Sequence, residues 1–152
     1  KKRFSLLGGA FGFVLLSLYF YIKEKYLGYI FEQVDITTLT KSKLLIDFNK
    51  STNELINIFF KKINFENELL ENKYGFILVG IEDKSSIESF NSQVYDYPNI
   101  KNNIIDKTFS NIENFENIIL ITKIGRLKKN QLIEIIRIVE ISNRNIFGFI
   151  NI

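Results

Sequence analysis

The chain contains no cysteine and no histidine. These absences exclude disulfides, thiol nucleophiles, the usual zinc sites and histidine-based catalytic triads. Any chemistry is therefore limited to carboxylates, lysine, hydroxyl groups and metal ions held by oxygen. Methionine is also absent, so we expect the chain to be processed or to be a piece of a longer protein.

A concentrated basic surface is lacking as well. The formal net charge is +3, and after residue 32 lysine and glutamate are interspersed along the sequence. Nucleic-acid-binding domains instead gather basic residues on one face, commonly with aromatic platforms. The sequence therefore predicts no nucleic-acid partner.

The chain opens with KKRFSLLGGAFGFVLLSLYFYIKEKYLGYIFE, in which residues 4–22 carry no charge. As a helix this run would be roughly 28 Å long, close to the hydrocarbon thickness of a bilayer. It is apolar all round except for Ser5 and Ser17, whereas helices of globular domains keep a polar face. The pattern predicts a transmembrane helix.

Two other interpretations of this run are a cleavable export signal and a buried core helix. A signal has a shorter apolar region that ends at small residues, whereas this run ends in bulky aromatics. We interpret Tyr19, Tyr21, Lys23 and Lys25 as anchors in the headgroup layer of a membrane, where aromatic and basic residues gather. Basic residues flank both ends of the run, so charge does not determine its orientation.

Glycines occur inside the same run, at Gly8, Gly9 and Gly12. The spacing of Gly8 and Gly12 is the one that lets two helix backbones approach closely in lipid. These glycines are therefore candidates for helix packing and self-association.

The remaining sequence alternates between two periodicities. Short apolar runs predict strands at 43–48, 76–81, 118–125 and 146–152. Helical spacing predicts helices at 51–70, within 83–94 and at 126–143, with Ser51 and Ser85 as the capping residues of the first two. We expect an α/β fold with a small, mainly parallel sheet, similar to a degenerate P-loop or Rossmann-like domain. The predicted organisation is a membrane helix with its flanks (1–32), a linker and first strand (33–50), and an α/β domain (51–152).

The turn at 79–86, VGIEDKSS, is the segment most similar to a phosphate loop. It lacks the second glycine that such a loop needs. Glu82 and Asp83 would also place carboxylates where backbone amides should meet phosphate oxygens. We assign no catalytic, cofactor-binding or metal-binding residue, and we expect the chain not to be an enzyme.

The order of these parts resembles a known family. The apolar helix followed by IKEKYLGYIFEQVDI resembles the second membrane helix and exit segment of the polysaccharide chain-length determinants, also called polysaccharide co-polymerases. The closing segment from ENIILITKIG to GFINI is similar to the end of the tyrosine-kinase-like domain that many relatives carry. The phosphate loop, the aspartate motifs and the tyrosine-rich tail of the active kinases are missing.

The resemblance implies a non-catalytic regulator in the inner membrane that sets the chain length or export of a polysaccharide such as O-antigen of lipopolysaccharide, capsule or exopolysaccharide. It implies a homo-oligomeric scaffold, a polysaccharide polymerase or export machinery as partner, and a cytoplasmic C-terminal domain. Two alternatives are a membrane-anchored nucleotide-dependent kinase or sugar-transfer enzyme, and a generic single-pass protein-binding domain.

Overall fold

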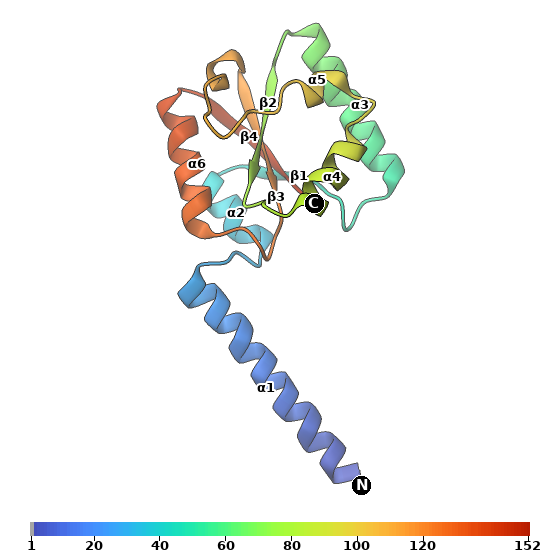
Figure 1. The fold of residues 1–152 in the computed structure, drawn as a ribbon, viewed down its shortest axis with the longest axis vertical. Helices are drawn as coiled ribbons and strands as arrows, with labels where there is room; N and C mark the ends of the chain where they lie inside the picture. Colours follow the sequence, from blue (N-terminus) through green and yellow to red (C-terminus); the bar gives the residue numbers. More distant parts are fainter. Residues whose placement is uncertain (1) are drawn as a thin grey trace.

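The structure, a computed structural model, describes the backbone of residues 2–152 and the side chains of residues 12–25 and 27–152. One long helix extends away from an α/β domain in which a sheet lies between helices (Figure 1). The elements in chain order are α1 (Lys2–Leu27), α2 (Gln33–Thr40), β1 (Lys43–Asp47), α3 (Asn53–Leu69), β2 (Tyr74–Val79), α4 (Lys84–Gln93), α5 (Pro98–Lys101), a 3-10 turn (Ile112–Asn114), β3 (Asn117–Thr122), α6 (Lys129–Ile141) and β4 (Asn145–Asn151).

The sheet has four strands in the order β1-β4-β3-β2, and every neighbouring pair is parallel. The predicted α/β class and mainly parallel sheet are confirmed. All of the predicted strands are present, with ends shifted by up to three residues from the expected ones. Strands β2 and β3 are apolar at consecutive positions because helices cover both faces of the sheet.

Alternate residues of the strands supply two separate cores. In β3, Ile118 and Leu120 point into the core on the α6 side, and Ile119 and Ile121 point into the core on the α3 side. Helices α2 and α6 cover the first face, while α3, α4 and α5 cover the second (Figure 1). The largest fully buried side chains include Phe60, Phe76, Phe90 and Phe149.

Both predicted capping residues are wrong by one or two positions. Helix α3 is capped by Thr52, whose hydroxyl accepts from the amide of Leu55 at 3.4 Å. Helix α4 is capped by Asp83, whose carboxylate accepts from the amide of Ser86 at 3.1 Å. A carboxylate is at least as good a cap as a hydroxyl and also favours the positive end of the helix.

The region predicted as linker contains helix α2. Its Ile36 is fully buried in the core on the α6 side. The helix ends at Thr40, whose buried hydroxyl donates to the carbonyl of Ile36 at 2.8 Å. The C-cap residue that follows, Lys41, takes the left-handed conformation with φ 53°. The α/β domain therefore begins at α2, ahead of the first strand.

The predicted membrane-spanning helix at 4–22 is not supported. Residues 4–22 do lie within one helix, α1. Among the residues whose side chains are described, however, no helix is both long enough and apolar enough to cross a bilayer. The side chains of the first part of the run, up to residue 11, lie outside the described residues.

Gly148 provides a test of how tightly β4 is packed. A Cβ atom there would lie 2.5 Å from Cγ of Leu45 and 2.8 Å from the backbone oxygen of Lys43. We expect Gly148→Ala to lower the free energy of unfolding by about 1–3 kcal/mol, because overpacking forces neighbouring atoms to shift. Urea denaturation of the full chain in detergent, followed by circular dichroism, measures this. Gly12→Ala is the control, since no atom of the described residues beyond its own stretch of helix lies within 4 Å of a Cβ there. Equal midpoints for the two variants would contradict the packing.

Candidate functional site

Ligands of open α/β sheets bind beyond the carboxyl ends of the strands. In this chain the polar side chains at that edge include Asp47 at the end of β1, Asp83 after β2, Lys123 after β3 and Asn151 at the end of β4. They form two clusters, one at β1 and β4 and one at β2 and β3.

The first cluster is centred on Asp47, which is almost completely buried. Its carboxylate accepts from Nε2 of Gln33 at 2.7 Å and from Nδ2 of Asn151 at 3.1 Å. It also accepts from the backbone amide of Asn49 at 3.0 Å. Oδ1 of Asn151 in turn accepts from the amide of Ile124 at 3.0 Å. The cluster joins α2, β1, β4 and the loop after β3, and both carboxylate oxygens are engaged in holding them.

The second cluster is centred on Asp83. Its Oδ2 accepts from the hydroxyls of Ser86 and Ser85, the latter at 3.0 Å. Lys123 Nζ lies 3.5 Å from Oδ2, and Arg126 Nη1 lies 2.9 Å from Oδ1 as an ion pair. Hydrogen bonds, above all that from the Ser86 hydroxyl, together with the charge of Lys123, hold the pKa of the Asp83 carboxyl well below its usual range.

This second cluster lies at the N-terminus of α4, and helix N-termini are general anion-binding positions. The carboxylate of Asp83 accepts a hydrogen bond from the amide of Ser86 at the N-terminus of α4. A phosphate bound to a helix N-terminus would use the same kind of amide. Lys123 is turned toward Asp83 and toward Ser86, whose hydroxyl it also contacts. The arrangement ties the loop after β2 to the loop after β3.

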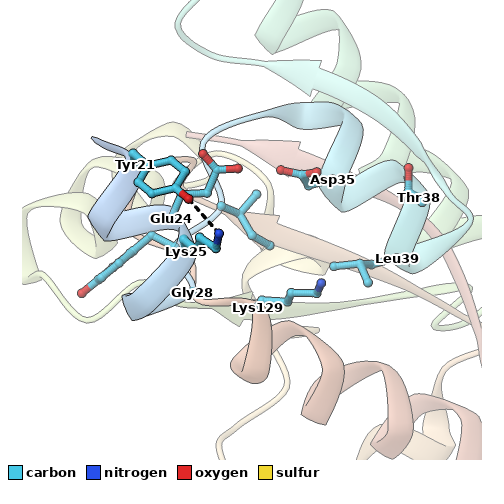
Figure 2. A pocket seen from close by; sticks show the side chains of 10 residues that line it. Tyr21, Glu24, Lys25, Gly28, Asp35, Thr38, Leu39 and Lys129 are labelled. Carbon is cyan, nitrogen blue, oxygen red and sulfur yellow. Dashed lines mark hydrogen bonds between the residues drawn. The ribbon is translucent and has the colours of Figure 1, made fainter. Parts of the chain in front are cut away.

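A cavity of about 550 Å³ lies where α1 meets the domain (Figure 2). The end of α1 forms one wall, α2 another, and the start of α6 the third. Glu24, Lys25, Asp35 and Lys129 place both signs of charge around it. The remaining lining residues are Tyr21, Gly28, Tyr29, Ile30, Thr38 and Leu39.

The linker after α1 pairs with the segment that precedes α6. Ile30 donates its amide to the carbonyl of Leu127 at 2.8 Å, and Gly125 donates to the carbonyl of Ile30 at 2.7 Å. Lys129 donates to the carbonyl of Gly28 at 2.7 Å. Gly28 has φ +67°, a conformation that glycine adopts without strain, so the chain can turn here from the helix into this pairing.

Aromatic rings and lysines alternate around this junction. The ammonium group of Lys23 lies 5.2 Å from the ring centre of Tyr19 and 5.1 Å from that of Tyr29. Lys128 approaches the Tyr29 ring as well, at 5.4 Å. These are distances at which a cation is attracted to the face of an aromatic ring.

The predicted interfacial anchors all belong to this junction. Lys25 donates to the hydroxyl of Tyr21 at 2.7 Å, as the dashed line in Figure 2 marks. Tyr19, Tyr21 and Lys23 lie with it in the last turns of α1. Tyr29 and Lys128 also belong to the junction. The sequence does not indicate them, because they come together through an antiparallel bridge between segments far apart in the chain.

Of the predicted helix-packing glycines, Gly8 and Gly9 lie outside the residues with described side chains. Gly12 faces open space: among the described residues, no atom beyond its own stretch of helix lies within 4 Å of a Cβ position. Within residues 12–25 and 27–152, no group of three or more acidic residues is arranged to hold a metal ion.

Comparison of the chain with models of protein families, with curated proteins and with solved structures found no match in any of the three.

The Asp83 cluster predicts a pH dependence. Its carboxyl has a pKa lowered from 3.8, so its charged form stabilises the fold above that pH, and this contribution is lost as the pH falls toward the lowered value. We expect Asp83→Asn, which keeps a capping oxygen but no charge, to lower the thermal midpoint at pH 7 by a few degrees. The difference from the wild type should narrow below about pH 4 in thermal scans. A difference that is constant from pH 7 to pH 3 would contradict a role for the charge.

Proposed function

We propose that α1 inserts into a lipid bilayer and holds the α/β domain at the membrane surface, where the domain acts as a non-catalytic scaffold. The observation that carries this proposal is the surface of α1. Its large apolar side chains between residues 13 and 22 are all exposed, although the α/β domain already has two complete cores without them.

Lipid fits this surface better than a protein groove does. Successive residues of a helix point about 100° apart, so this apolar run, broken only at Ser17, covers every side of the helix. A partner protein would cover one stripe and leave the opposite stripe in water. A bilayer surrounds the helix, and transfer of such side chains out of water is favourable at every position.

The junction residues suit the boundary between lipid and water. Tyr19 and Tyr21 place rings at the end of the apolar run, and Lys23 and Lys25 lie beside them. Tyrosine rings and lysine side chains are both favoured at the headgroup layer, where the apolar part is buried and the polar end reaches water. The domain would then begin directly beyond the headgroups.

Membrane insertion can be tested by adding charge to the exposed run. We expect Leu15→Arg/Leu18→Arg to reduce the vesicle-bound fraction of the full chain at least about tenfold, because arginine is costly within the hydrocarbon layer. Flotation with phosphatidylglycerol-containing vesicles measures this fraction. The control is Ile141→Arg, which adds the same charge at an apolar side chain that is 83% exposed at the end of α6. Equal flotation of the wild type and the double variant would contradict insertion.

We further propose that the scaffold regulates the chain length or export of a surface polysaccharide, with the α/β domain on the cytoplasmic side. This assignment is supported by the resemblance of the helix and its exit segment to the polysaccharide co-polymerases. It is compatible with the Asp83 cluster, whose carboxylate accepts from an amide at the N-terminus of α4 and pairs with Lys123. A scaffold needs only the packing surface of such a domain.

The assignment predicts a change in the polysaccharide itself. Deleting the gene in the source organism should change the modal length of the polysaccharide or remove its long form, because the regulator of polymerisation is lost. Gel separation of the extracted polysaccharide measures this. Complementation with the wild-type gene should restore the pattern, and complementation with the Leu15→Arg/Leu18→Arg gene should not. An unchanged length distribution on the gel, with expression of the gene demonstrated, would overturn the polysaccharide assignment. It would not bear on membrane insertion, which the flotation experiment tests separately.

A further inference from the structure

Helix α3 is apolar on two opposite faces. Its inner face, formed by Ile56, Phe60, Ile63 and Asn67, is buried against the sheet and α4. Its outer face carries four large apolar side chains that are exposed. They are Leu55 (55% exposed), Ile58 (59%), Phe65 (61%) and Leu69 (66%).

The exposed side chains of α3 are regularly spaced. Together with Lys62 they occupy positions 55, 58, 62, 65 and 69, so the steps along the helix alternate between three and four residues. This is the spacing of a seam that packs against another helix with side chains interlocked. We call these five positions the α3 seam. For comparison, the outward side of α6 presents Glu134, Arg137 and Glu140 to water.

We propose that the α3 seam pairs with the same seam of a second copy of this chain, with the two helices antiparallel and related by a two-fold axis. The charges beside the seam favour this occupant. Lys61 and Glu68 border the seam on one side, both are exposed, and neither forms an ion pair within the described residues. In an antiparallel pair centred between Lys62 and Phe65, Lys61 lies opposite Glu68 of the partner subunit, and the symmetry repeats this contact.

The parallel arrangement is disfavoured by Lys62. A parallel pair in register would place Lys62 against Lys62 of the partner subunit in the middle of an apolar seam, where like charges repel. In the antiparallel pair Lys62 instead lies beside Phe65 of the partner subunit, where its stem can cover the ring and its ammonium group can contact the ring face. Its own ion pair with Glu66, at 4.0 Å, can persist.

The α3 seam lies away from the junction with α1. Helix α1 meets the domain at α2 and at the start of α6, whereas α3 packs on the opposite face of the sheet (Figure 1). A dimer through α3 therefore leaves α1 uncovered, and it does not depend on whether α1 enters a membrane.

Charge reversal tests the pairing. We expect Lys61→Glu alone and Glu68→Lys alone each to raise the dimer dissociation constant about tenfold, because each creates like charges across the interface. The double variant Lys61→Glu/Glu68→Lys should restore it. Lys107→Glu, at an exposed loop position, is the control. Analytical ultracentrifugation of the full chain in detergent at several concentrations measures the constant, and circular dichroism verifies that each variant is folded.

Two results would overturn the proposal. The first is a monomer at every concentration. The second is a dimer whose dissociation constant is the same in both single variants as in the Lys107→Glu control, which is the result expected if the chains associate through α1.

Cysteine cross-linking tests the orientation without background, because the chain has no cysteine of its own. The antiparallel pair places Ile58 in the same layer as Leu69 of the partner subunit, whereas Ile58 and its own copy are about 16 Å apart along the axis. Mixed Ile58→Cys and Leu69→Cys chains should therefore form cross-linked dimers on mild oxidation, and either variant alone should form few. Efficient cross-linking of each variant alone, without the mixed product, would overturn the antiparallel arrangement.

Discussion

The fold depends on one constraint, which is that a parallel sheet must be covered on both faces. Because strands β2 and β3 are apolar at consecutive positions, helices are required on each side. The connection from β2 to β3 helps to cover both faces of the sheet. It contributes α4 and α5 to one core, passes the edge of β2, and then contributes Ile112 and Phe115 to the other core. On the way, Phe76 donates to the carbonyl of Asn103 at 3.0 Å and accepts from the amide of Ile105 at 2.8 Å.

The strands and the two long helices of the domain were predictable because each has a strong local signal. A continuous apolar run of strand length with turn residues in front of it, such as 76–81, indicates a buried strand, and helical spacing indicates α3 and α6. Helix α2 was missed because it is short and three of its eight residues are threonine, a residue with low helical preference. The caps were misplaced for a different reason. Asp83, and not Ser85, caps α4, and its carboxylate also pairs with Lys123 and Arg126 from another loop. A local sequence pattern does not show these partners.

The residues at the junction and those at the sheet edge also differ in how far the sequence indicates them. Tyr19, Tyr21, Lys23 and Lys25 could be selected from their position at the end of an apolar run. The hydrogen bond between Asn151 and Asp47 joins residues 104 positions apart, and no local pattern indicates it. Polar contacts of this kind depend on strand order, so they can be read only after the topology is known.

The pairing of the linker with the start of α6 has a mechanical consequence. Backbone hydrogen bonds on both sides of Tyr29 attach the end of α1 to the loop that leads into α6. The linker is therefore not a free hinge, because the angle between α1 and the domain cannot change at residues 28–30 without breaking these bonds.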